Sequence, residues 1–480
     1  MAIINGLIGD FGKYHLWLCF IIFPNKLGAA FHQMSIIFLA PPPVYYCPNN
    51  KSCCDEPVYD KSQYKRTIVM EWNLICGNAW LKDLTQMAFQ FGVLSGSLLF
   101  GIASDKYGRR PALIVSIVLE VFSGIVTSFL PDFWSFTIVR MFLGASVGGV
   151  MVVGFVIVME YVGKCRDMVA AAYHVPFTVG YMLLALFGYY IRDYVILQLS
   201  ISLVNIVLLV YICILPESPR WLLAKQKTTA AIQLLEHVAK INNKPVDEIA
   251  LKVELYQLEH IRQKRGSFID LFRTPNLRKN ILVMSFTWLV CSYCFYGVTY
   301  YISHLAGDVY VNVIASGTVI FMSCFIAMPL IKFMKRRTLL VMSHVLSGFC
   351  LLTIAVMPVG RISVGFGCLG LLFTQMVFII SYLYCSEMFP TVVHNAAVGI
   401  CSMMARLGSM LAPFVADFGE FGEWCPPVAF GIMPIIAAAL GLLLPETKDC
   451  QLMLTIEEGE AFGRNQSSRR TENNASIGIT

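Results

Sequence analysis

Charged residues are scarce in this chain. They make up 14% of its 480 residues, whereas 57% of the residues are hydrophobic. Soluble proteins carry about 25% charged residues, so a chain this apolar does not have the composition of a soluble enzyme of its length. The apolar residues gather in long runs, many of them near the ~20 residues that a membrane-spanning helix needs. The composition therefore predicts an all-α membrane protein.

Motifs for several kinds of chemistry are also missing. The sequence has no nucleotide-binding motif, which argues against pumping driven by ATP, and no cysteine spacing that resembles a zinc site. Gly144 to Gly148 fit the GxSxG pattern of a hydrolase, but that motif needs a strand-to-helix turn and here lies inside an apolar run. Acidic residues are interspersed among the lysines of segment 225–265, which argues against a nucleic-acid partner. We therefore expect no enzyme activity, no cofactor and no metal.

Twelve apolar runs are candidates for membrane-spanning helices. Pro24, Asn25 and Lys26 interrupt the first of them, so we expect that run to be bent. Basic residues follow the second, fourth, sixth and eighth runs, and the positive-inside rule places those loops and both termini in the cytoplasm of a multi-pass plasma-membrane protein. The runs lie at about 14–40, 83–103, 111–130, 133–160, 168–190, 194–215, 280–303, 310–331, 338–358, 363–386, 392–416 and 425–444.

The first extracellular connection, at about 41–80, is rich in cysteine. Thiols outside the cell can oxidise, so its four cysteines predict one or two disulfides, with three full pairings open; four free thiols are the alternative. The same loop carries an N-glycosylation sequon at Asn50, whereas the sequons at Asn465 and Asn474 lie in the predicted cytoplasmic tail. The four cysteines are Cys47, Cys53, Cys54 and Cys76.

This topology predicts that Asn50 alone is glycosylated. Treating intact cells with an external glycosidase should increase the electrophoretic mobility of the protein, and Asn50→Gln should abolish that change. A change that survives Asn50→Gln but disappears when the tail is deleted would reverse the predicted orientation.

Matching residues recur along the chain at nearly one spacing. Three pairs are 227 residues apart and a fourth is 229 apart, which is much less expected by chance than a single match. We therefore predict two related six-helix halves that bind a substrate at mid-membrane, between them. The pairs are Arg109 and Arg336, Arg110 and Arg337, Glu160 and Glu387, and Glu217 and Glu446.

The repeat sets the predicted domain boundaries. The first half covers 1–215 and the second 280–447. Segment 216–279 is a cytoplasmic linker, in which Leu251, Leu255 and Leu258 fall on one helical face, so amphipathic helices are expected. The tail, 448–480, is rich in polar residues and predicted to be disordered.

The repeated charges predict a gate on the cytoplasmic side, which holds the two halves together while the cavity opens outward. Lys332 and Lys335 replace Asp105 and Gly108 in the second copy, so we expect the first copy to contribute more. The alternative is that the basic residues only set the topology. The predicted network contains Asp105, Arg109, Arg110, Glu160, Glu217, Arg220, Arg336, Arg337, Glu387 and Glu446.

Several motifs resemble a known family. GIASDKYGRR (101–110) resembles the loop motif of the major facilitator superfamily. Within that superfamily, EWNLIC (71–76), PESPRWLL (216–223), SEMFPTVV (386–393) and RLGSMLAPF (406–414) resemble the organic cation/anion/carnitine transporters. The resemblance runs from about residue 11 to 447. It implies the major facilitator fold and a secondary transporter of small organic ions that works by alternating access. Its coupling ion is left open.

The chain departs from the family pattern in three places. The first extracellular loop is shorter than is usual in the family, His394 stands where an arginine is common, and Ile320 stands where an acid is common. These differences bear on glycosylation, gating and the charge chemistry of the second half.

Arg406 is the single charge in residues 396–415. A charge at the centre of a membrane helix costs roughly 2.5–3.5 kcal/mol on insertion scales, so it is a functional candidate. On a helix it shares a small, polar face with Gly399, Ser402, Ser409 and Pro413, opposite a predicted lipid-facing side. A structural ion pair with Glu120 is the alternative role.

The family resemblance gives Arg406 a substrate role. It implies arginine at this place in anion and carnitine carriers, and aspartate in cation carriers. We therefore expect an organic anion or a carnitine-like zwitterion as substrate. An organic cation transporter is the first alternative, and a receptor-like protein or channel on the same fold is the second.

Aromatic residues are predicted to line the same cavity. Their rings could enclose an apolar substrate body or hold an ammonium group, although rings in membrane helices often serve only packing. The residues are Trp288, Phe295 and Tyr296, which match an aromatic motif of the family, together with Tyr382 and Tyr384.

Overall fold

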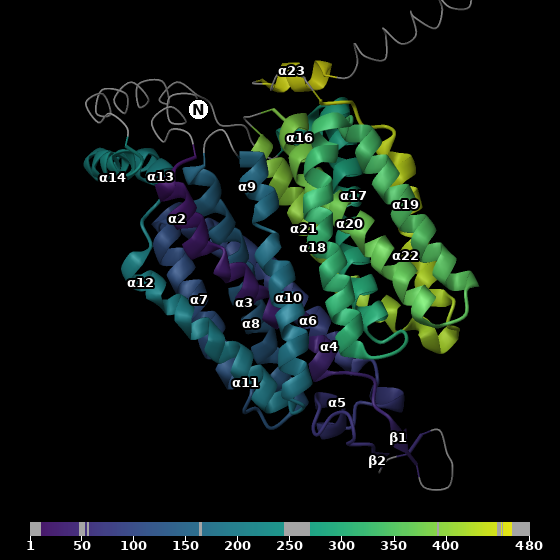
Figure 1. Cartoon of the computed structure of the whole chain (residues 1–480). Coiled ribbons are helices and arrows are strands. Elements are labelled where there is room, and N and C mark those ends of the chain that lie inside the picture. The colour runs from purple at the N-terminus through teal and green to yellow at the C-terminus, as the bar shows by residue number, and fades with distance from the viewer. Residues whose placement is uncertain are drawn as a thin grey trace, which may run out of the picture. The chain divides into compact units, whose positions relative to one another are not determined.

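The chain forms two bundles of helices. The computed structural model describes residues 11–47, 53–54, 57–162, 166–243, 269–390, 393–448, 453 and 455–462. Unit 1 comprises Met1–Gln263 with Asp308–Thr318, and unit 2 comprises Lys264–Gly307 with Val319–Thr480 (Figure 1). The domain boundaries derived from the repeat stay a prediction.

The first apolar run is broken where proline predicted a bend. Pro24 has no N–H to donate and occupies the first position of a new helix, where a proline is tolerated. The preceding helix closes with the N–H of Phe23 bound to the carbonyl of Cys19 at 2.9 Å. The run is therefore divided into α2 (Lys13–Ile22), α3 (Pro24–Met34) and α4 (Ile36–Leu39).

The other helices of unit 1 follow the predicted runs closely. Asp132 and Asp193 cap two of them through backbone N–H groups of the first turn, as short polar side chains do at helix starts. These helices are α6 (Leu81–Tyr107), α7 (Arg109–Thr127), α8 (Phe133–Tyr161), α9 (Arg166–Ala172), α10 (Val175–Tyr190), α11 (Tyr194–Val204), the 3-10 helix η3 (Asn205–Val210) and α12 (Tyr211–Ile214).

Glycines let α6 and α8 pack backbone to backbone. A Cβ atom at Gly92 or Gly96 of α6 would overlap carbonyl oxygens of α8, and one at Gly144 or Gly148 would overlap carbonyl oxygens of α6. The GxSxG pattern therefore serves the close packing of membrane helices. It does not form a nucleophile turn, since all five of its residues lie inside α8.

Unit 2 repeats this design. Ten helices of the described residues are long and apolar enough to cross a membrane; the broken first run and the shorter helix α22 correspond to the other two predicted spans. The elements are α16 (Asp270–Arg273), α17 (Pro275–Ser303), α18 (Val309–Phe333, which begins within the range of unit 1), α19 (Arg336–Val356), α20 (Arg361–Met388), α21 (His394–Ala416), η4 (Phe418–Phe421), α22 (Cys425–Gly441) and α23 (Ile456–Ala461).

The neighbours of each helix recur between the units. In unit 1, α3 packs on α8 and α10, and α7 packs on α8 and α11. In unit 2, α17 packs on α20 and α21, and α19 packs on α20 and α22. These pairs correspond in chain order, which confirms the predicted fold of two related six-helix halves.

The cysteine-rich loop is held by two disulfides. Cys47 is bonded to Cys54, and Cys53 to Cys76, which is one of the three pairings left open by the sequence. The loop forms a hairpin of β1 (Tyr45–Tyr46) and β2 (Val58–Tyr59), followed by α5 (Ile68–Glu71) and η2 (Cys76–Asn78). Asn50, Asn465, Asn474 and the leucines at 251, 255 and 258 lie outside the described residues.

The EWNLIC motif docks this loop on the bundle. Trp72 packs on Phe133 and Phe136 of α8, and its indole N–H donates to the carbonyl of Pro131 at 3.2 Å. Glu71 pairs with the Arg66 guanidinium, with 2.5 Å between Nη2 and Oε1. The hydrogen bond from Arg66 holds the pKa of the Glu71 carboxyl below its usual range.

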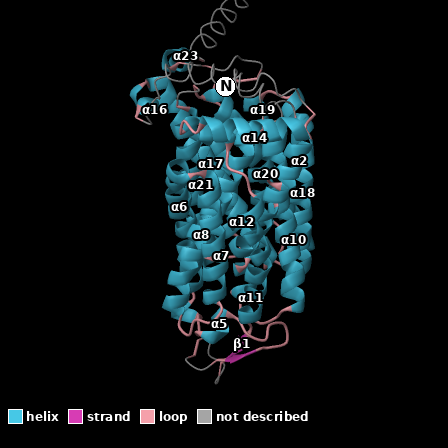
Figure 2. Ribbon diagram, turned by 90° about the vertical axis from the view of Figure 1, so that its left-hand side faces the viewer, coloured by secondary structure: helices cyan, strands magenta, loops and turns pink. Residues whose placement is uncertain are grey.

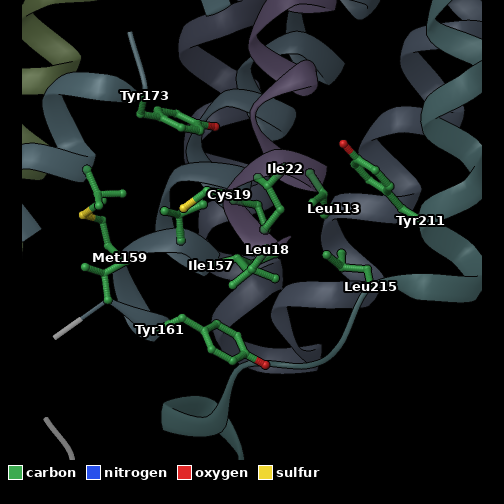
Figure 3. Close-up of a cluster of buried hydrophobic side chains, with 14 of the residues drawn as sticks. Leu18, Cys19, Ile22, Leu113, Ile157, Met159, Tyr161, Tyr173, Tyr211 and Leu215 are labelled. Atoms are coloured by element: carbon green, nitrogen blue, oxygen red, sulfur yellow. The ribbon is translucent and has the colours of Figure 1, made fainter. Parts of the chain in front are cut away.

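At the opposite end of unit 1, short helices lie against the bundle (Figure 2). Trp221 and Leu222 of α13 (Pro219–Ala224) pack with Leu235 of α14 (Thr228–Ile241), an amphipathic helix of the predicted linker. Beside them is the apolar core that joins α2, α7, α8 and α12, where Tyr161 lies near Leu18 (Figure 3). The Tyr161 hydroxyl donates to the carbonyl of Glu217 at 2.7 Å, so it ties the segment before α13 to α8.

Candidate substrate site and charge networks

Glu217 caps the N-terminus of α7. Its Oε1 atom accepts the backbone N–H groups of Arg109 at 2.9 Å and Arg110 at 3.2 Å. These N–H groups have no partner within the helix, and the helix dipole favours an anion beside them. Gly108, between α6 and α7, has φ +122°, and a Cβ there would overlap the Glu217 carboxylate. Glycine is therefore required for the turn that α7 starts from.

The Arg109 side chain joins two more acids. Its Nη2 atom is 2.9 Å from Oε1 of Glu160, at the end of α8, and its Nη1 atom is 2.5 Å from Oδ1 of Asp105, at the end of α6. The planar guanidinium can make both contacts at once. Arg110 instead donates to the carbonyl of Ile212 at 2.8 Å. The network therefore links the ends of three helices of unit 1.

The second copy makes the same contacts at the matching positions. Glu446 accepts the backbone N–H groups of Arg336 at 2.8 Å and Arg337 at 3.2 Å, which begin α19. Nη2 of Arg336 lies 3.1 Å from Oε1 of Glu387. The residues paired by the repeat thus have equivalent partners. One contact differs: Nη1 of Arg336 donates to the carbonyl of Ile331, where Arg109 binds a carboxylate.

Each network, as described, is built from side chains of one unit. The contacts brace helix ends within that unit, and the predicted role in holding the two halves together stays a prediction. The Arg337 side chain donates to the carbonyl of Leu444 at 3.5 Å, and Arg220 stands in the first turn of α13, partly buried.

The difference between the copies predicts unequal effects of mutation. Arg109→Ala should reduce initial uptake rates more than Arg336→Ala, because Arg109 binds two carboxylates and Arg336 binds one. Asp105 is largely exposed, so its ion pair with Arg109 is worth about 0.2–1 kcal/mol. We therefore expect the loss of uptake in Arg109→Ala to exceed that in Arg336→Ala by about 1.4- to five-fold. Rates should be normalised to surface protein, with exposed Arg361→Ala as the control. Equal losses would contradict the asymmetry.

An aromatic cluster lies between α17 and α20. The ring centroids of Trp288 and Tyr382 are 4.3 Å apart, and Phe378 lies 5.5 Å from Tyr382 and 6.0 Å from Trp288. Phe295 packs edge-on to Tyr296 at 5.3 Å and lies 6.5 Å from Phe378. Four of these rings were predicted. Phe378 was missed, although it lies one helical turn before Tyr382, on the same face of α20.

Arg406 approaches this cluster from α21. Its guanidinium lies near the hydroxyl groups of Tyr296 and Tyr382. A cation therefore lies beside two tyrosines of the aromatic cluster within unit 2. This arrangement can bind a carboxylate through the guanidinium and an apolar or ammonium-bearing body through the rings.

The packing of α21 explains the direction of Arg406. A Cβ at Gly408 would overlap the backbone carbonyl of Leu289, so α21 and α17 touch closely there. Leu407 and Leu411 form an exposed apolar stripe. Arg406 lies between the face of α21 that contacts α17 and the exposed face that carries the leucines, and its side chain is partly buried.

Tyr384 lies outside the cluster, and its substrate role stays a prediction. The residue is wholly buried and its hydroxyl donates to the carbonyl of Pro445. A similar bond in unit 1 runs from the Tyr161 hydroxyl to the carbonyl of Glu217. Tyr384 precedes the end of α20 by one turn, which directs it to the segment after α22 rather than to α17.

Glu120 has partners of its own in unit 1. Its Oε1 atom accepts a hydrogen bond from the Asn205 amide at 3.0 Å, and Nε2 of His32 is 3.9 Å away. All three residues are buried, and Gln198 extends the cluster towards His32. Asn205 and His32 give the buried carboxyl of Glu120 polar neighbours within unit 1, so its presence in α7 does not require an arginine partner. The sequence signal for them was the occurrence of single polar residues inside apolar runs.

We expect Glu120 to stabilise unit 1 by hydrogen bonding. Glu120→Leu should lower the free energy of unfolding by about 0.6–2 kcal/mol, since it leaves the buried Asn205 amide without its acceptor. Glu120→Gln keeps an acceptor and should be closer to wild type. Thermal unfolding of the purified protein measures both. An equal loss in the two variants would mean that the carboxyl acts by its charge instead.

The chain is similar to known membrane transporters. Residues 48–458 match the family described as "Sugar (and other) transporter". An "organic cation transporter-like protein" of Drosophila melanogaster is 32% identical over 520 residues, covering 95% of this chain and 92% of the relative. "Solute carrier family 22 member 3" of Rattus norvegicus is 34% identical over 407 residues, covering 83% of this chain and 73% of the relative.

Solved structures show the same fold. The inward-open xylose transporter XylE from E. coli superposes with a TM-score of 0.69 and 17% identity, over 93% of this chain and 99% of that one. At this identity the likeness concerns the fold alone.

Proposed function

This chain belongs to the organic ion transporters of solute carrier family 22, within the major facilitator superfamily, and we propose that it carries a small organic ion across the plasma membrane by alternating access. It is a multi-pass membrane protein with the fold of secondary transporters. We place both termini in the cytoplasm, on the distribution of basic residues among the loops.

The substrate we propose bears a carboxylate, as an organic anion or a zwitterion. The observation behind this proposal is the position of Arg406 beside Tyr296 and Tyr382. A guanidinium keeps its charge at any physiological pH and matches a carboxylate with two parallel hydrogen bonds. A fixed positive charge in an apolar medium also repels a cation more strongly than it would in water.

An organic cation is the second candidate, and the comparisons favour it. Two Drosophila relatives, both 32% identical to this chain, are named as an organic cation transporter and an organic cation transporter-like protein. The rings of Trp288, Phe378 and Tyr382 could hold an ammonium group, at about 0.5–2 kcal/mol per contact. A zwitterion would use both the guanidinium and the rings.

Exchange of the charge at Arg406 separates the candidates. Arg406→Asp should reduce uptake of a carboxylate-bearing substrate by about ten- to a hundred-fold, since a hydrogen bond to a charged group is worth about 1.5–3 kcal/mol. Arg406→Lys keeps the charge but loses the planar fork, so it should weaken apparent affinity before it changes selectivity. Uptake of organic anions, carnitine-like zwitterions and quaternary amines should be measured at equal surface abundance.

Tyr384→Phe provides a control, because this ring lies outside the cluster. Wild-type uptake of quaternary amines alone, unchanged in Arg406→Asp, would establish the cation candidate and remove Arg406 from the substrate site. Substrate-independent fluxes, or none at all, would instead favour a channel or a receptor-like protein on the same fold.

A further inference from the structure

Arg140 of α8 is a buried cation without an acid. The side chain is wholly buried, two turns into α8. Its Nη2 atom donates to Oε1 of Gln86 at 3.1 Å and to the hydroxyl of Ser35 at 3.5 Å, and both acceptors are neutral. Within the part of the chain that the structure describes, Arg140 forms no ion pair, and its Nε and Nη1 atoms have no hydrogen-bond partner.

Two further buried amide side chains of unit 1 are also unsatisfied among the described residues. Gln33 of α3 and Gln90 of α6 are wholly buried, and neither amide atom of either residue has a partner among the described residues. Gln86 connects them to Arg140: its amide N–H donates to the backbone carbonyl of Gln33 at 3.3 Å, and it precedes Gln90 by one turn of α6. Gln33 of α3, Gln90 of α6 and Arg140 of α8 therefore all keep unused hydrogen-bonding groups, and the contacts of Gln86 link their helices.

Aromatic rings flank the same group. The guanidinium carbon lies 5.3 Å from the ring centroid of Phe89 and 5.9 Å from that of Phe136. Ring faces attract a cation, but they carry no net charge. Neutral acceptors and rings thus hold the guanidinium in place without neutralising it.

A buried charge of this kind needs a counter-charge. Removing an ion from water costs several kcal/mol even after the protein relaxes, and arginine does not escape this cost by losing its proton. Glu120 is engaged by Asn205 and His32, so it does not serve Arg140. A water molecule could accept the free N–H groups, but it would leave the charge unbalanced.

We propose that Arg140, with Gln33 and Gln90, forms a binding site for a small monoanion. The anion accepts hydrogen bonds from Nε and Nη1 of Arg140 and from the two amides, and it balances the guanidinium charge. Chloride and the carboxylate end of an organic molecule share this chemistry. The site is made by residues of unit 1, whereas Arg406 belongs to unit 2, and this inference does not rest on the substrate proposed above.

Anion-dependent stability tests the site on the purified full-length protein. We expect the thermal unfolding midpoint to rise in a saturable way as chloride replaces gluconate at constant ionic strength. The rise in unfolding midpoint should vanish in Arg140→Met. It should persist in Arg406→Ala, the control variant, which also loses an arginine from a membrane-spanning helix. An equal rise in wild type and Arg140→Met, or no rise above the gluconate baseline with either chloride or benzoate, would overturn the proposal.

If Arg140→Met does not fold, a second variant tests the anion site. Gln90→Leu removes one neutral donor, and it should raise the chloride concentration for half of the shift by about two- to ten-fold. An unchanged concentration would contradict the site. Benzoate in place of chloride distinguishes the two sources: a rise with benzoate but not with chloride, still dependent on Arg140, assigns the site to a carboxylate. Loss of the rise in Arg406→Ala but not in Arg140→Met would place the anion at the substrate site instead.

Discussion

A polar group inside lipid hydrocarbon has no water to bind, and this constraint governs most of the molecule. Backbone N–H and C=O groups can be satisfied there only within helices, because an open strand edge would leave them unpaired. Helices that cannot gain stability by hiding apolar surface from water associate through close packing instead. The glycines at the contact of α6 and α8, and Gly408 at the contact of α21 and α17, follow from this requirement.

The same constraint operates at the helix ends. The N-termini of α7 and α19 expose unpaired N–H groups, and Glu217 and Glu446 satisfy them with a carboxylate that follows the last helix of each half. Because each acid binds the helix start directly, the arginine side chains are free to join other helix ends. The duplicated contacts therefore brace each six-helix unit before they serve any gating.

Positive side chains outnumber negative ones within the apolar spans. Among the described residues, and apart from charges near the ends of the apolar runs, Lys26, Arg140 and Arg406 are positive, whereas Glu120 is negative. Lys26 lies over the ring of Tyr173, at 5.1 Å from its centroid. An interior with this excess of positive charge favours anions over cations, which agrees with the proposed carboxylate-bearing substrate and with a monoanion at Arg140. The names of the relatives favour a cation, and uptake measurements decide between them.

Local properties of the sequence were enough to determine the helices and the family. Hydrophobic run length located the spans, Pro24 located the break between α2 and α3, and the repeated spacing paired Arg109 with Arg336 before any contact was known. The tertiary structure decided which cysteines bond, and that Tyr384 binds a backbone carbonyl while Tyr382 joins the aromatic cluster. It also decided that two nitrogen atoms of Arg140 have no hydrogen-bond partner among the described residues. The physical reason is that hydrophobicity and helical period depend on neighbours along the chain, whereas the partner of a buried polar side chain depends on how distant helices pack together.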